Sequence, residues 1–128
     1  MADSATTPKP TLTKTDDGYL VASWAGALNG VATGGQVCMS RIKPGSMSLQ
    51  VGGTFGSATA VLQGSNDGTN FVTCRMAAAI AIAGTPDAAS FTSAGAGKVL
   101  DDAFRYYRMS TSGGTNSAVT MLLVAMRD

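Results

Sequence analysis

The sequence predicts an all-β protein, a single-domain β-sandwich, on three observations. A turn sequence, Ser65-Asn66-Asp67-Gly68, separates two strand-like runs at 58–63 and 70–74. Turn residues recur about every 8 to 12 positions, which gives about eight short strands. No segment shows the strand–helix–strand rhythm of a parallel α/β sheet. This pattern favours a jelly roll, and an immunoglobulin-like sandwich is the alternative because strand order cannot be read from the pattern.

The turn at Asn66, Asp67 and Gly68 is the clearest local signal in the chain. Asn and Asp tolerate a positive φ and form hydrogen bonds with their own backbone, and Gly adopts a positive φ without steric cost. These three turn-defining residues therefore predict a β-hairpin.

The N-terminal residues 1–11 are rich in Ser, Thr and Pro and show no periodicity. Pro8 and Pro10 disfavour both helix and ladder pairing. We expect an extended arm over residues 1–11 and a sandwich domain over residues 12–128. Residues 12–14 begin a strand, and a turn follows at 16–18.

The first clear strand spans residues 19–25, with Leu20, Ala22 and Trp24 on one face. Trp24 is the single tryptophan and is expected to anchor the core. A Gly/Asn-rich loop at 26–35 precedes a strand at 36–42. Residues 47–51 alternate apolar and polar side chains, as a half-buried strand does. The glycines at 52–56 predict a bulge or bend.

The second half of the chain predicts shorter strands. Residues 76–83 favour a strand or extended loop over a short helix, and residues 90–93 form a short strand. The glycine-containing segment 94–97 is expected to interrupt the strand pattern, and residues 98–100 are expected to pair briefly with another strand. The strand at 105–111 places Tyr106 and Tyr107 on opposite faces. Residues 118–126 are apolar on both faces, which indicates a central strand or a strand whose outer face another subunit covers.

The composition favours a protein that works within an assembly. Charged residues are 13% of the 128 residues, about half the usual share, and the net charge is +1. The absence of a basic block argues against nucleic-acid binding through phosphates. No apolar run is long enough to span a membrane, and the first ten residues lack the features of a signal peptide. We therefore expect synthesis in a cytoplasm and no membrane partner.

The sequence offers no evident reactive site. The chain has no histidine, which removes the commonest general base and zinc ligand. The acidic pairs at 16–17 and 101–102 are interpreted as solvated turns, because calcium needs about six converging oxygens. We expect no catalytic residue, metal, cofactor or small-molecule substrate. Cys38 and Cys74 are expected to be buried thiols, with a disulfide between neighbouring strands as the alternative.

Arginines beside apolar strands, the prolines of the arm and several apolar strand residues are candidates for contacts with a partner. The candidate residues are Pro8, Pro10, Leu12, Ile80, Ile82, Arg105, Arg108, Met121 and Leu123.

The segment SATAVLQGSNDGTNF (57–71) resembles a signature that recurs in small virion proteins of tailed bacteriophages. The later pieces FTSAG (91–95), FRYYR (104–108) and the apolar strand 118–126 follow the same order. The family most similar is that of the head-decoration, or cementing, proteins. This resemblance covers residues 47–127 and implies a jelly roll or related sandwich, no enzymatic activity, and the major capsid protein as partner.

The resemblance implies a structural protein on the outer surface of a phage head, where it cements neighbouring capsomers. Self-association is also expected, with a dimer favoured over a trimer because two-fold symmetry is the commonest. The alternative function is a sandwich module of a tail or fibre that binds carbohydrate. The aromatic side chains are expected to be buried, which disfavours that alternative.

Overall fold

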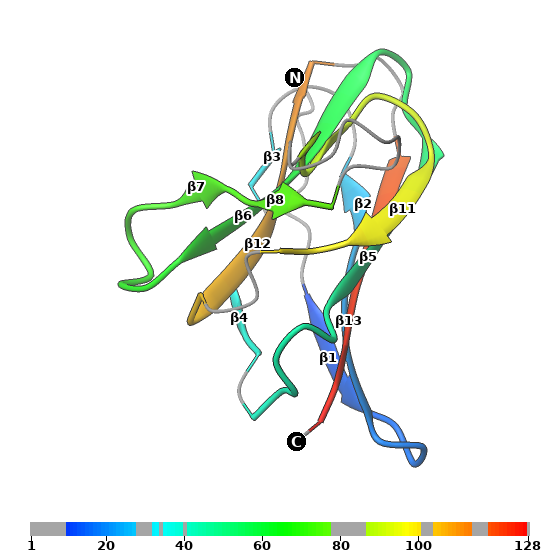
Figure 1. Cartoon of the computed structure of the whole chain (residues 1–128). Coiled ribbons are helices and arrows are strands. Elements are labelled where there is room, and N and C mark those ends of the chain that lie inside the picture. The colour runs from blue at the N-terminus through cyan, green and yellow to red at the C-terminus, as the bar shows by residue number, and fades with distance from the viewer. Residues whose placement is uncertain are drawn as a thin grey trace.

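The computed structural model describes residues 10–27, 32–33, 35–39, 41–77, 87–100, 104–113 and 118–127. All regular elements within these ranges are β-strands, and no helix occurs among them. The strands form two main antiparallel sheets, which Figure 1 shows as two layers, with β6 and β12 on one side and β2, β5 and β13 on the other. The described residues include no helix long and apolar enough to cross a membrane.

The first sheet, sheet A, has the strand order β1-β2-β13-β5-β11. Its strands are β1 (Thr11–Lys14), β2 (Tyr19–Ala27), β13 (Ala118–Met126), β5 (Ser48–Thr54) and β11 (Gly95–Lys98). The two longest strands, β2 and β13, pair with each other near the middle of the sheet, with a register shift between Val119 and Met121.

The second sheet, sheet B, has the order β10-β6-β12-β3, with β4 also paired to β12 and β7 to β6. Its strands are β10 (Ser90–Phe91), β6 (Ala58–Ser65), β12 (Tyr106–Gly113), β3 (Ala32–Thr33), β4 (Val37–Cys38) and β7 (Val72–Thr73). A separate pair joins β8 (Arg75–Met76) to β9 (Asp87–Ala88).

The strand order identifies the sandwich as a jelly roll. Going inward from the two ends of the chain, β2 pairs with β13, β4 with β12, β5 with β11, and β6 with β10. These nested pairs alternate between the two sheets, which is the arrangement of two Greek keys wound together. The predicted all-β class and jelly roll are confirmed, and the immunoglobulin-like alternative is wrong because its sheets are built mainly from sequential neighbours.

The core lies between the two sheets and contains side chains from both. Strand alternation places the even positions Leu20, Ala22 and Trp24 of β2 inside, as predicted. Sheet B contributes Leu62, Tyr107 and others to the same cluster. The indole Nε1 of Trp24 donates a hydrogen bond to the Gly35 carbonyl at 2.7 Å, so the only polar atom of this side chain has a partner.

Several predicted elements match the structure closely. Met47, Leu49 and Val51 are buried, as the alternation predicted, and the last two lie in β5. Tyr107 is fully buried whereas Tyr106 is half-exposed, so these neighbours do face opposite sides of β12. The apolar segment at the end of the chain is the central strand β13.

Other predicted boundaries are confirmed only in part or are wrong. The bend expected within 52–56 is found at the end of that range, at Gly56 and Ser57, which both have a positive φ. Gly52 and Gly53 do not interrupt β5, which pairs with β13 through Thr54. The segment 94–97 does not interrupt the strands as expected, because Gly95–Lys98 forms β11. The strand expected at 36–42 is reduced to β4, and the loop expected at 26–35 contains the end of β2 and all of β3.

The two cysteines are not joined in a disulfide, and Cys74 is buried whereas Cys38 is exposed. The alternative of a disulfide between them is therefore wrong, and so is the expected burial of Cys38. Of the predicted arm, residues 1–9 lie outside the described ranges. Strand β1 begins at Thr11, one residue before the predicted domain boundary.

Candidate interaction surfaces

The hairpin predicted at Asn66, Asp67 and Gly68 joins β6 to β7, with Gln63 opposite Thr73 and Gly64 opposite Val72. Gly68 has a φ of 75°, in the region that glycine adopts most readily. The buried hydroxyl Oγ of Ser65 accepts hydrogen bonds from the backbone N–H of Asp67 at 3.3 Å and of Gly68 at 3.0 Å. Side-chain hydrogen bonds therefore shape this loop as much as glycine does.

Asp67 organises the second half of the loop. Its Oδ1 accepts hydrogen bonds from the backbone N–H groups of Thr69 and Asn70, both at 2.8 Å, and its Oδ2 accepts one from Nδ2 of Asn70 at 2.8 Å. The Ser65 hydroxyl donates a fourth, at 2.8 Å. These hydrogen bonds hold the pKa of the Asp67 carboxyl well below its ordinary value, and those from the backbone N–H groups of Asn70 and Thr69 have the largest effect.

This lowered pKa predicts an acid-sensitive hairpin. Because the folded state binds the Asp67 proton less readily than the unfolded chain, the stabilisation is complete above the unfolded pKa of about 4 and is lost as pH falls below it. The variant Asp67→Asn is expected to be less stable at pH 7 and to lose less stability between pH 5 and pH 2. Urea unfolding across this range measures both effects. The control is Asp16→Asn at the exposed turn after β1, and equal acid sensitivity of Asp67→Asn and the wild type would contradict the prediction.

An exposed cluster of arginines and aromatics lies on the outer face of sheet B, beside this hairpin. We call it the arginine–aromatic surface, and its members are Gln63, Phe71, Arg105, Tyr106 and Arg108. The guanidinium carbon of Arg108 lies 3.8 Å from the centre of the Phe71 ring. Its Nε donates a hydrogen bond to Oε1 of Gln63 at 2.8 Å, directly across the β6–β12 ladder. Two contacts therefore fix the direction in which this cation is presented.

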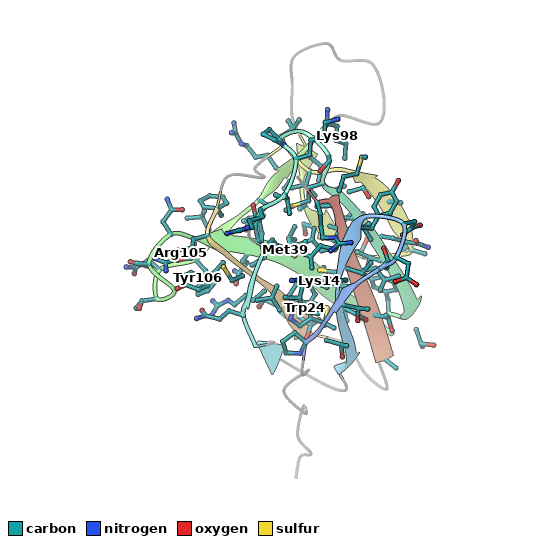
Figure 2. The ribbon with its side chains drawn as sticks, turned by 90° about the horizontal axis from the view of Figure 1, so that it is seen from below. Lys14, Trp24, Met39, Lys98, Arg105 and Tyr106 are labelled. Atoms are coloured by element: carbon teal, nitrogen blue, oxygen red, sulfur yellow. The ribbon has the colours of Figure 1, made fainter. Side chains whose placement is uncertain are left out.

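Arg105 and Tyr106 extend the surface toward the start of β12, and Figure 2 shows their side chains together near the hairpin. The guanidinium carbon of Arg105 lies 5.3 Å from the Tyr106 ring centre, within the range of a cation–π contact. Phe104 anchors this segment from the other side. The Phe104 ring lies edge-on to the Tyr107 ring, with 6.2 Å between the two ring centres. It also occupies the space beside Gly64, where an added Cβ would lie 2.3 Å from Cδ2 of Phe104.

A second exposed surface is the outer face of sheet A. Met121 and Leu123, which the sequence analysis offered as partner contacts, are fully buried in the core of this chain. That interpretation is wrong because β13 is apolar on both faces, and Met121 and Leu123 belong to the face that points into the core. The alternate residues Leu122 and Val124 face outward, half-exposed, and Val124 lies opposite Val21 of β2. The centre of this face is apolar and is framed by Thr13 and Ser48 in the same row.

The described residues include only some of the remaining candidates for partner contacts. Pro10 is half-buried beside Gly35, where an added Cβ would lie 2.9 Å from its ring. Leu12 in β1 is 45% exposed. Arg105 and Arg108 belong to the arginine–aromatic surface. The other candidates, Pro8, Ile80 and Ile82, lie outside the described residues.

Sequence reasoning missed Gln63, Phe71 and Tyr106 as members of one surface. The alternation in FRYYR places Tyr106 and Arg108 on the same strand face, which was the available signal. Gln63 and Phe71 are joined to Arg108 by strand register, which the sequence does not display. The described residues contain no group of three or more Cys, Asp or Glu arranged to hold a metal ion. The two surfaces present cations, aromatic rings and apolar side chains to solvent.

No family model and no curated protein matches the chain. Among solved structures it is similar to the SPBc2 prophage-derived protein YomS, with a TM-score of 0.59 and 7% sequence identity over 84% of this chain and 94% of that one. A cupin domain from Bordetella pertussis aligns with a TM-score of 0.37 and 10% identity, covering 99% of this chain and 100% of that one. The likeness to YomS concerns the fold alone.

Proposed function

We propose that this protein is a structural component of a bacteriophage virion, without enzymatic activity, that binds the outer surface of the capsid and cements neighbouring capsomers. Its partner is the major capsid protein, and it is made in the host cytoplasm before it joins the head. The observation that carries the proposal is the arginine–aromatic surface. Further support comes from the resemblance of residues 57–71 to virion proteins and from the prophage origin of YomS.

The arginine–aromatic surface has the composition of a protein-binding patch. Tyr, Phe and Arg are enriched at protein interfaces, and Tyr and Arg are enriched among the residues whose removal costs most affinity. Arg108 is already held by Gln63 and Phe71, so binding immobilises it at a small entropic cost. Gln63, Tyr106 and Arg108 lie on the paired strands β6 and β12, and the other two members directly precede β7 and β12. Strand pairing therefore keeps the surface in register for a repeated capsid surface.

Cementing requires a second attachment, and the outer face of sheet A supplies a candidate for self-association. Leu122, Val124 and Val21 form the apolar centre through which two copies pair, in place of the buried Met121 and Leu123. A dimer that engages two capsomers makes the second contact intramolecular, which raises avidity by roughly 10²–10⁴. Light scattering on the free protein distinguishes the favoured dimer from a trimer.

The part of the predicted arm that precedes Pro10 and strand β1 is proposed as an additional contact along the capsid. Ordering an extended segment costs about 1–2 kcal/mol per residue in backbone entropy, so its order must come from contacts made in the assembly.

The decisive measurements are the location and copy number of the protein in virions of the phage that encodes it. Hundreds of copies on the head support cementing, whereas a handful on the tail would contradict it. On purified heads, Arg108→Ala is expected to lower affinity at least about fivefold, the scale of an interface residue whose truncation costs more than about 1 kcal/mol. The control Lys98→Ala removes one positive charge from β11, on the other sheet. Unchanged binding of Arg108→Ala would remove this surface from the contact.

A carbohydrate-binding module of a tail or fibre is the second candidate, and one observation favours it. Tyr106 and Phe71 are half-exposed on the outer face of sheet B, whereas the sequence analysis expected the aromatic side chains to be buried. Aromatic rings beside polar side chains are a common surface for sugars. Binding on a glycan array that Tyr106→Ala abolishes supports this candidate, and an array without signal excludes the glycans it displays.

A further inference from the structure

A basic groove opens between the edges of the two sheets, where its lining residue Cys38 pairs across the strands with Tyr106 of the arginine–aromatic surface. It has a volume of about 490 Å³ and is lined by Leu12, Lys14, Leu20, Cys38, Arg41 and Arg127. Ligand sites in proteins commonly span about 300–1,000 Å³. One wall is the inner side of β1 and β2, and the other is the segment that carries β4 and Arg41. Figure 1 shows β1 and β4 at this end of the sandwich.

The groove gathers cations from three separate parts of the chain. Lys14 ends β1, Arg41 precedes the bridge between Ile42 and Arg127, and Arg127 follows β13. Arg127 is held in place because its Nη2 donates a hydrogen bond to the Thr15 carbonyl at 2.9 Å and its backbone N–H donates one to the Gly18 carbonyl at 2.8 Å. None of the described residues that line the groove carries a carboxylate. The groove therefore attracts an anion, and arginines favour a carboxylate with paired oxygens.

Strand β1 forms one rim of this groove and is an edge strand. Within the described residues it pairs with β2 alone, so its other side presents backbone N–H and C=O groups. Leu12 and Lys14 lie opposite Ala22 and Leu20, two core-facing residues, so the side chains of β1 alternate toward the groove. Such an edge accepts an added strand from another chain, and the pockets beside it select alternate side chains.

We propose that this groove receives an extended acidic segment of a partner protein. The segment adds as a strand to β1, with an apolar side chain beside Leu12 and, two residues along, a carboxylate among Lys14, Arg41 and Arg127. The leucines and the strand edge favour a peptide over a nucleic acid, because a nucleic acid has neither apolar side chains for the leucines nor a peptide backbone that can pair with the strand edge. The site is independent of the arginine–aromatic surface, so it stands even if the protein does not bind a phage head.

The test uses the full chain, labelled with ¹⁵N, and the probe peptide acetyl-Thr-Val-Thr-Asp-Thr-amide. Amide shifts are expected at residues 11–14 and around Arg41 and Arg127, and they should diminish as salt is added. Replacing Asp by Asn in the peptide is expected to weaken binding about tenfold, the scale of a hydrogen bond between charged groups.

Matched variants locate the charge effect. The double variant Lys14→Gln/Arg41→Asn is expected to weaken binding of the Asp peptide at least about tenfold. Asparagine is chosen at position 41 because Arg41 has a φ of 58°, which asparagine tolerates. The control Lys98→Gln changes a cation on β11, at the opposite edge of sheet A, and should leave binding unchanged. Arg108→Ala should also leave it unchanged.

Four results would overturn the proposal. They are equal affinity for the Asp and Asn peptides, no shift at millimolar peptide, shifts confined to other surfaces, and shifts of the same size with acetate alone, which would indicate a site for small anions. A single-stranded oligonucleotide that binds the groove more tightly than the Asp peptide would likewise replace a peptide with a nucleic acid as occupant.

Discussion

Trp24→Ala is expected to lower the free energy of unfolding by about 3–5 kcal/mol, the range measured when large aromatic side chains are removed from protein cores. Trp24 is fully buried between the sheets, and its indole also bonds to the Gly35 carbonyl. The substitution leaves both a cavity and a carbonyl without its donor. Since domains of this size are stable by about 5–15 kcal/mol, a single change would remove a large part of the total.

The measurement is urea unfolding followed by far-UV circular dichroism, because the variant lacks the only tryptophan. Tyr19→Ala is the matched control. It removes an aromatic side chain from the same strand, but Tyr19 is 37% exposed, so its loss should be much smaller. Trp24→Phe refills most of the space and isolates the contribution of the hydrogen bond. A loss below about 1 kcal/mol for Trp24→Ala would show that the core tolerates the cavity, contrary to its tight packing.

Gly53→Ala is expected to lower the stability of the fold more than any of the other substitutions except Trp24→Ala. Gly53 has a φ of 106°, where a residue with a side chain is strained by about 1–3 kcal/mol. An added Cβ would also lie 2.2 Å from the carbonyl oxygen of Ala118, a backbone atom that cannot move without separating β5 from β13. The clash adds to the strain, so we expect a loss of more than about 2 kcal/mol and a weakened central ladder.

The neighbouring glycine provides the control. A Cβ on Gly52 meets nothing within 4 Å, and its φ is not positive. Gly52→Ala is therefore expected to change stability by less than about 0.5 kcal/mol. Thermal unfolding of the two variants, which differ in position by a single residue, separates the effect of the close backbone approach from any general effect of glycine replacement. Equal losses would contradict the geometric explanation.

The sequence predicts those parts of the fold that depend on local patterns. The alternation at Leu20, Ala22 and Trp24 and the turn at Asp67 and Gly68 are local properties, and both are found in the structure. The nested order of the strands is not local, because it is decided by pairing between distant segments. The resemblance of residues 57–71 supported the jelly roll, and hydrophobic periodicity alone did not distinguish it from other sandwiches.

The errors have physical causes. Glycine is disfavoured in strands, so Gly95 and Gly97 were interpreted as a break. In the structure they make room for other side chains, since an added Cβ would lie 2.9 Å from the Phe91 ring and 2.7 Å from the methyl carbon of Met76. Met121 and Leu123 were assigned to the outside because β13 is apolar on both faces, and the pairing of Leu123 with Ala22 decides which face is inside.

The candidate surfaces were predictable only as single residues. Arg105 and Arg108 were identified from their strand, but the contact of Arg108 with Gln63 joins residues 45 positions apart. The basic groove combines Lys14, Arg41 and Arg127 from distant segments, and the even spread of charge along the sequence gives no sign of it.

The pairing of β2 with β13 has a consequence for biogenesis. Leu20 is matched to Ala125, so β2 finds its principal neighbour about 100 positions further along the chain. A nascent chain that has not yet reached β13 leaves the apolar residues of β2 without this neighbour. Closing so long a loop also slows folding. Chaperone binding is therefore expected to be stronger for nascent chains stalled before Ala118 than for chains in which β13 has left the ribosome, and nonsense mutations before Ala118 should yield molecules that never acquire a native centre.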